Sequence, residues 1–87
     1  MTIYYLPRFR RSYKRLDPKI QAQAEDRVAL FRADPTDPRL GTHRLHGKLK
    51  NQWSFSVDQR YRIVFEFLDG THETAVLLDI GTHALYS

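Results

Sequence analysis

Histidines and arginines are the residues of this chain with the most distinctive chemistry. His83 follows a Gly-Thr pair near the end of the sequence, and His43 and His46 lie in the segment GTHRLHGKLK. Imidazole groups take or give a proton near neutral pH because their unperturbed pKa is about 6.5. The guanidinium groups of Arg60 and Arg62 are permanently charged and suit the stabilisation of phosphate. These residue types fit metal-independent cleavage of RNA, which needs a base, an acid and cations.

Each of these residues also has a simpler interpretation. A histidine at a strand end is commonly solvated or a capping residue, and histidines in loops are commonly exposed. The two arginines would also keep an open sheet face soluble. The histidines of HRLH with His83 are weak evidence for a metal site, because the chain has no cysteine and offers no fixed fourth ligand. We therefore predict no metal and no other cofactor, and the convergence of several residues supports the catalytic hypothesis.

The composition indicates one small basic domain over residues 1–87. Fourteen Lys and Arg residues against ten Asp and Glu residues give a net charge of +4, and the basic residues cluster in PRFRRSYKR and HRLHGKLK. Such a surface suits a polyanion or an acidic protein partner. The segment MTIYYLPRFRR has the features of neither a signal peptide nor a membrane span. With no cysteine to indicate an oxidising compartment, we expect a cytoplasmic protein without membrane association.

The first half of the chain predicts a strand followed by two helices. The segment TIYYL is rich in strand-forming residues and ends at Pro7. A short helix is then predicted by apolar positions four and three residues apart, namely Phe9, Tyr13 and Leu16. Asp17 is expected to cap a second helix, which ends near Asp34. Its apolar stripe consists of Ile20, Ala24, Val28 and Phe31.

Alternating patterns in the second half predict three antiparallel strands. In QWSFSVD the expected core side is Trp53, Phe55 and Val57, and in RYRIVFEF it is Tyr61, Ile63, Phe65 and Phe67. The segment LDGTH predicts a turn. In ETAVLLDIG we expect Val76, Leu78 and Ile80 on the core side, with Leu77 and Asp79 opposite. The predicted fold is α+β, in the order β-α-α-β-β-β, with two helices on one face of a small, mostly antiparallel sheet.

The same alternation gathers polar residues on the other, open face. The residues expected there are Ser54, Ser56, Asp58, Arg60, Arg62 and Asp79. His83 shares their side if strand geometry continues past Gly81. The loop beside this face carries His43, His46 and the cations Arg44, Lys48 and Lys50. We therefore expect a polar, partly cationic surface that brings the candidate catalytic residues together.

Nearly the whole chain resembles the RelE/ParE superfamily of bacterial type II toxins. The resemblance rests on the order of the predicted elements and on the segments HRLHGKLKNQWSFSV, YRIVF and LLDIGTHALY. The ending is most similar to the YafQ-type branch, whose catalytic histidine in a terminal Gly-Thr-His corresponds to His83. A histidine of that branch ahead of Leu-x-Gly corresponds to His43. The strand arginine of RelE-type toxins corresponds to Arg62, and their C-terminal tyrosine corresponds loosely to Tyr86.

The sequence also departs from both branches. RelE-type toxins carry catalytic lysines on the strand where this chain has Ser54 and Ser56. The further histidine and aspartate of the YafQ-type branch fall near Ser56 and Arg60. In their place, Lys48, Lys50 and His46 are available from the neighbouring loop.

The resemblance implies a toxin that cuts mRNA in the ribosomal A site without a cofactor. In that role His83 is the leading general acid or base, His43 or His46 is the second, and Arg62 holds the phosphate. Tyr86 would stack on or orient the RNA, and the RNA-binding cations would be Arg44, Lys48, Lys50 and Arg60. The implied partners are the ribosome, mRNA and an acidic antitoxin that folds on binding. Two alternatives stay open: a ParE-like inhibitor of DNA gyrase, and an inactive module that only binds its antitoxin.

Overall fold

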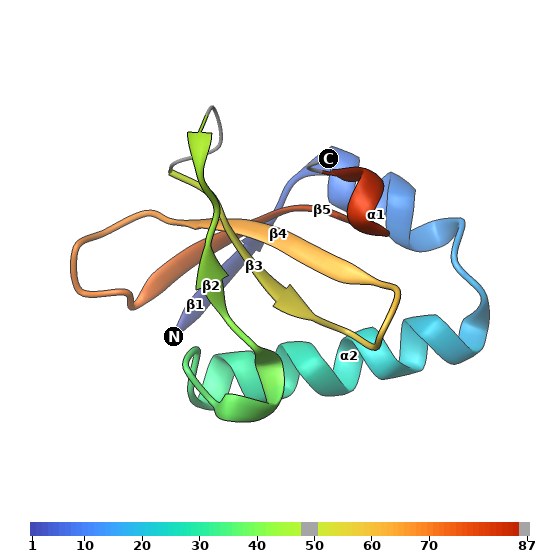
Figure 1. Ribbon diagram of the computed structural model, residues 1–87, viewed down its shortest axis with the longest axis horizontal. Coiled ribbons are helices and arrows are strands. Elements are labelled where there is room, and N and C mark those ends of the chain that lie inside the picture. The colour runs from blue at the N-terminus through green and yellow to red at the C-terminus, as the bar shows by residue number, and fades with distance from the viewer. Residues whose placement is uncertain (48–50, 86–87) are drawn as a thin grey trace.

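The computed structural model describes residues 1–47 and 51–85 and shows two helices packed against a five-stranded sheet (Figure 1). The elements are β1 (Thr2–Tyr5), α1 (Pro7–Lys14), α2 (Pro18–Ala33), the 3-10 turn η1 (Pro38–Leu40), β2 (His43–Arg44), β3 (Trp53–Ser56), β4 (Arg62–Phe67), β5 (Thr74–Gly81) and the 3-10 turn η3 (His83–Leu85). This confirms the predicted α+β fold, with the two-residue strand β2 as an addition. None of the helices in the described ranges is long and apolar enough to cross a membrane.

The sheet is mixed, with the strand order β1-β5-β4-β3-β2. Strand β1 runs parallel to β5, and every other neighbouring pair is antiparallel. The chain leaves β1 at one edge, forms both helices, and returns to the opposite edge at β2 (Figure 1). Three successive antiparallel strands then bring the C-terminal end of β5 back beside the start of β4.

The helices begin and end where the sequence provides the expected signals. Asp17 caps α2, because its carboxylate accepts a hydrogen bond of 2.8 Å from the Lys19 backbone N–H. Pro18 occupies the first helical position, where a missing N–H costs nothing. The helix ends at Ala33, and the Asp34 N–H closes its last turn by donating to the Leu30 carbonyl at 2.9 Å.

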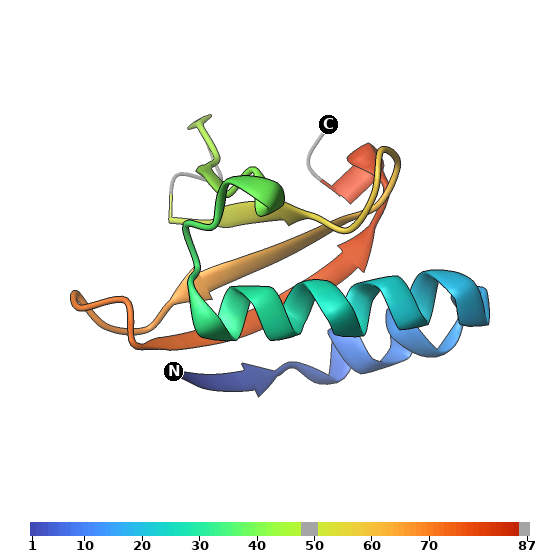
Figure 2. The same ribbon diagram turned by 90° about the horizontal axis from the view of Figure 1, so that it is seen from below.

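The core lies between the helices and one face of the sheet (Figure 2). Phe31 of α2 is completely buried, with its ring stacked on Phe55 at 4.6 Å and edge-on to Phe65 at 4.7 Å between centroids. Such aromatic pairs contribute about 0.5–1.5 kcal/mol beyond the burial of their area. Phe9, Ala24 and Val28 add the buried residues of the two helices. The helical stripes predicted from the sequence therefore face the core.

The predicted sides of β5 are wrong for its first half. Leu77 is completely buried in the core, whereas Val76 and Leu78, expected there, are only partly buried. The cause is a β-bulge: Phe65 pairs with Leu77 and Val64 with Asp79, so that Leu78 is an extra residue. A bulge shifts the alternation by one residue, and a regular pattern of sides does not reveal it. Beyond the bulge, Ile80 faces the core and Asp79 faces away, as predicted.

The face predicted to be open is partly covered. Ser54 is completely buried and Val64 is 4% exposed, although both point away from the helices. Leu45, which follows β2, is also buried and lies outside the main core cluster. Within the described ranges the Ser54 hydroxyl has no hydrogen-bond partner. The polar surface on this face is therefore smaller than the alternation predicts.

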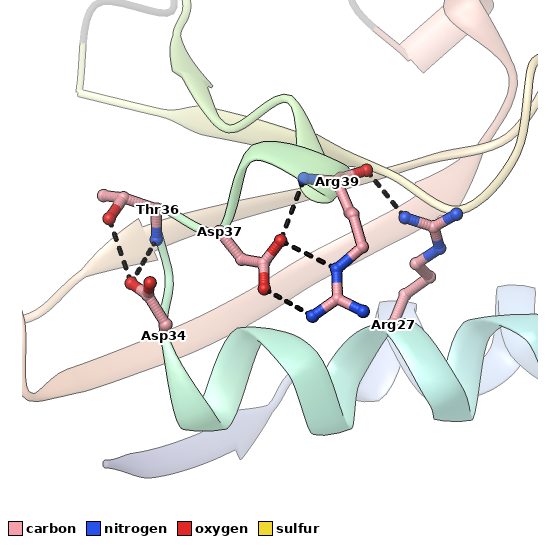
Figure 3. A network of polar contacts seen from close by, with 5 residues as sticks. All are labelled: Arg27, Asp34, Thr36, Asp37 and Arg39. Carbon is pink, nitrogen blue, oxygen red and sulfur yellow. Dashed lines mark hydrogen bonds and ion pairs between the residues drawn. The ribbon is translucent and has the colours of Figure 1, made fainter.

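Two aspartates organise the segment between α2 and β2 (Figure 3). Asp34 accepts hydrogen bonds from the backbone and hydroxyl of Thr36 at 3.0 and 2.9 Å. The carboxylate of Asp37 accepts from the Arg39 backbone at 2.9 Å and from its guanidinium at 3.0 and 2.8 Å. Arg27 of α2 donates to the Arg39 carbonyl at 2.6 Å. The bond from Arg27 attaches the segment to α2, and the other bonds fix its own turns.

Asp37 is expected to make stability depend on pH. The hydrogen bond from the Arg39 side chain is the main cause that lowers the pKa of Asp37 from 3.8 to about 2. A lowered pKa in the folded state means that the carboxylate stabilises the fold above pH 4, and that this contribution is lost as pH falls toward 2. The Asp37→Asn variant should therefore have a lower melting temperature than the wild type at neutral pH, and the difference between the two melting temperatures should disappear in acid. A difference in melting temperature that stays constant down to pH 2 would contradict this.

Candidate active site

The strand register brings two predicted site residues to the face of the sheet opposite the helices. One row across the strands consists of Ser56, Arg62 and Gly81, and the next consists of His43, Ser54, Val64 and Asp79. Paired residues project to the same side of a sheet, and rows two residues apart lie about 7 Å from each other. Arg62 and His43 therefore share one face, and the row of Arg62 ends where β5 leads to His83.

Arg62 begins β4 and is half-buried. Its Nη1 donates to the backbone carbonyls of Asp58 and Tyr61 at 2.5 and 3.0 Å. Asp58 stabilises the turn between β3 and β4, because its carboxylate accepts hydrogen bonds from the Arg60 and Tyr61 N–H groups at 2.8 and 2.7 Å. Within residues 1–47 and 51–85, no acceptor engages Nε or Nη2 of Arg62. The guanidinium is thus held in place with donors left for an anion.

His43 is exposed on the edge strand β2. Its Nδ1 lies 3.0 Å from the carbonyl oxygen of Gly41. Because a carbonyl oxygen only accepts, Nδ1 must carry the proton, and Nε2 of the neutral ring has the free lone pair. Gly41 adopts a left-handed backbone (φ 60°) that favours glycine and turns its carbonyl toward this ring. The geometry prepares Nε2 of His43 to accept a proton.

His83 lies in the turn η3, immediately beyond β5, and is exposed. Strand geometry therefore ends at Gly81, and the alternation used to place His83 does not extend to it. The turn closes through a bond of 3.0 Å from the Leu85 N–H to the Thr82 carbonyl. A Cβ at Gly81 would lie 3.0 Å from the Leu85 side chain, so any larger residue there would require the Leu85 side chain to shift. The Gly-Thr-His sequence thus ends the strand and sets the turn that holds His83.

The other predicted site residues have different positions. His46 is exposed beyond β2, and Arg60 is exposed in the turn between β3 and β4. Arg44 pairs with Trp53 on the opposite side of β2 from His43, with its guanidinium 5.9 Å from the centre of the Trp53 ring. Lys48, Lys50 and Tyr86 lie outside the described residues. In the described part of the chain, no three His, Asp or Glu side chains are grouped to hold a metal ion.

Two features near this face have no signal in the sequence pattern. The Ser12 hydroxyl of α1 donates to the Asp79 carboxylate at 2.6 Å, which attaches α1 to the end of β5. A groove of about 550 Å³ also runs from Arg62 and Ser56 to Gln23 and Arg27 of α2. Both join elements far apart in sequence, so neither could be found from local periodicity.

No family model matches the sequence, and no curated protein matches it. Solved structures do match. YafQ from E. coli strain BL21(DE3) has a TM-score of 0.79 at 17% identity, covering 98% of this chain and 97% of that chain. The YoeB/ParE toxin from Agrobacterium tumefaciens has a TM-score of 0.77 at 16% identity, covering 95% of this chain and 99% of that chain. A chain of the toxin-antitoxin complex RelBE2 from Mycobacterium tuberculosis has a TM-score of 0.67 at 24% identity, covering 94% and 96%.

The likeness extends over nearly the full length of both chains in each comparison. It therefore concerns the whole domain and not one shared supersecondary unit. At these identities it concerns the arrangement of the backbone, and function has to be argued from the site. The chain has the fold of the YafQ and RelE-type toxins.

Proposed function

We propose that the chain is the toxin of a type II toxin–antitoxin system and that it cuts mRNA on the ribosome. The observation that supports this most is the placement of Arg62 and His43 on one face, at the end of the sheet from which β5 leads to His83. These residues supply the proton-transfer groups and the fixed cation that RNA cleavage needs. The fold shared with YafQ and with RelE-type toxins supports the same proposal.

In the proposed reaction, one histidine removes the proton of the ribose 2′-hydroxyl. The 2′ oxygen attacks the adjacent phosphorus, the bond from phosphorus to the 5′ oxygen breaks, and a second histidine protonates that oxygen. His83 is the leading candidate for one role and His43 or His46 for the other. Nε2 of His43 has the lone pair that a base requires. Arg62 stabilises the additional negative charge on the pentacoordinate phosphate.

A chain this small can be an enzyme because the ribosome would position the message. Holding reactants in a productive geometry lowers barriers by about 7–11 kcal/mol, and here the ribosome would supply most of that effect. The protein then has to add only the acid, the base and the phosphate clamp. Lys48, Lys50, Arg44 and Arg60 are the proposed contacts to the RNA backbone, and Tyr86 is the proposed stacking group.

The second proposed partner is an acidic antitoxin that folds as it binds. The chain is basic, and Tyr4 and Leu6 at the β1 edge are exposed apolar residues (56% and 39%). Between the helices lies a groove of about 580 Å³ lined by Phe9 and Tyr13, with Arg10 and Lys14 beside it. An acidic segment would gain charge attraction and apolar contacts on this side. The neighbour RelBE2 is itself a toxin–antitoxin complex.

Arg62 is expected to contribute to the rate through charge and geometry together. Arg62→Ala should lower the rate of mRNA cleavage about 10²–10³-fold, as loss of a transition-state donor does elsewhere. Arg62→Lys should recover only part of it, because an ammonium group cannot reproduce the planar fork. Single-turnover cleavage on programmed ribosomes measures both. Full activity in both variants would show that Arg62 has no role in cleavage.

Expression of the chain in bacteria tests the proposed function and separates it from the alternatives. We expect growth arrest, with new mRNA 5′ ends inside translated regions, and no change in plasmid supercoiling. Loss of supercoiling with intact mRNA would instead identify an inhibitor of DNA gyrase. Normal growth together with tight binding of an antitoxin would identify an inactive binding module.

A further inference from the structure

The groove beside Arg62 has walls from two separate parts of the chain. One wall is the end of β3 and the turn to β4, with Ser56, Gln59 and Arg62. The other wall is α2, with Gln23, Asp26 and Arg27. Asp26 and Arg27 follow Gln23 by three and four residues, so both lie on the side of the helix that carries Gln23. The volume of about 550 Å³ is in the range of pockets that bind small ligands.

The chemistry of these walls suits the edge of a nucleobase. The amides of Gln23 and Gln59 each offer a donor and an acceptor, Asp26 offers an acceptor, and the two arginines offer donors. Base edges are recognised by such combinations of donors and acceptors. The groove between α1 and α2 differs, because aromatic side chains line it. The groove that adjoins Arg62 is therefore the more polar of the two.

Arg27 is held at this groove by its own contact. Its Nη1 donates to the Arg39 carbonyl at 2.6 Å, and Arg39 is fixed in turn by Asp37 (Figure 3). Within the described ranges the other N–H groups of Arg27 have no acceptor. A guanidinium that is already ordered loses less side-chain entropy when it binds a ligand. The structure thus provides a second fixed cation on the far side of the groove from Arg62.

We propose that this groove binds the mRNA nucleotide next to the scissile phosphate and reads its base. The inference rests on the proposed function, because Ser56 and Arg62 belong both to the groove and to the catalytic row. An RNA strand whose phosphate contacts Arg62 places its neighbouring nucleotide at the opening of the groove. Gln23 and Gln59 then contact the base edge, and Arg27 contacts the phosphate or the base. The groove sets the sequence preference of cleavage.

The test is a comparison of cut-site preferences on ribosomes programmed with mRNAs that are randomised around the cleaved codon. Gln23→Ala and Gln59→Ala approach the groove from opposite walls, and Arg27→Ala removes its cation. Arg32→Ala is the matched control, because it removes an equal charge from the same helix outside this groove. Melting curves confirm that each variant is folded before its cuts are compared.

We expect the glutamine variants to lose preference at one position beside the cut by about fivefold or more, which is the discrimination typical of one base contact. The Arg32→Ala variant should keep the wild-type preference. A cleavage rate that falls equally at all sites, or a sequence preference that is unchanged in every variant, would overturn this inference. Neither result would contradict the proposed nuclease function. No cleavage by the wild-type chain would overturn the proposed function, and this inference with it.

Discussion

Replacing His83 with alanine is expected to lower the rate of mRNA cleavage about 10²–10⁴-fold, the usual contribution of a general acid or base. The side chain is exposed in η3, so its loss should change the stability of the fold little. Translation arrest should disappear in cells that express the variant. Single-turnover cleavage on ribosomes measures the rate, and a melting curve measures the stability.

His72→Ala is the matched control for this experiment. His72 is also an exposed histidine, but it lies in the turn between β4 and β5, where its ring stacks on Phe67 at 3.8 Å. Its replacement should leave the cleavage rate at the wild-type value. If His83→Ala cuts mRNA as fast as the wild type, His83 has a structural role, and the catalytic pair has to be sought at His43 and His46.

Phe31→Ala is expected to cause the largest loss of stability, about 3–5 kcal/mol. Phe31 is completely buried, and its ring contacts Phe55 and Phe65 of the sheet. Truncation removes these contacts and leaves a cavity between α2 and the sheet. Because the free energy of unfolding of small domains is only about 5–15 kcal/mol, this loss would remove a large part of it. Equilibrium denaturation in urea measures the loss.

Leu68→Ala provides the contrast, because Leu68 is 56% exposed and should change the free energy of unfolding by no more than about 0.5 kcal/mol. Similar losses in the two variants would show that the aromatic stack around Phe31 does not dominate the core.

The elements of the fold were predictable because their signals are local. Asp17 and Pro18 specify the start of α2 through a cap and a fixed backbone angle, and both act within one turn. The four-residue spacing of Ala24 and Val28 indicates the buried stripe without reference to the rest of the chain. The shared face of Arg62 and Ser56 follows from alternation in two regular strands.

The failures come from features that local patterns do not contain. The bulge at Leu78 depends on how β5 pairs with β4, so the sequence of β5 alone predicts the wrong side for Leu77. Ser54 alternates as an exposed residue, yet it is completely buried beside the strand β2, which is distant in sequence. The groove reaching Arg27 requires α2 and the turn after β3 to be placed together. Tertiary packing decides all three.

The most direct measurement of the central claim is cleavage of a defined mRNA by the purified chain, with and without ribosomes, in the presence of a metal chelator that leaves ribosomes intact. We expect cuts at discrete positions within the A-site codon only when ribosomes are present, with a cyclic phosphate on the 5′ fragment, and cuts slowed at least 10²-fold by His83→Ala. Intact mRNA on ribosomes, or equal cutting by the wild type and His83→Ala, would contradict the proposal.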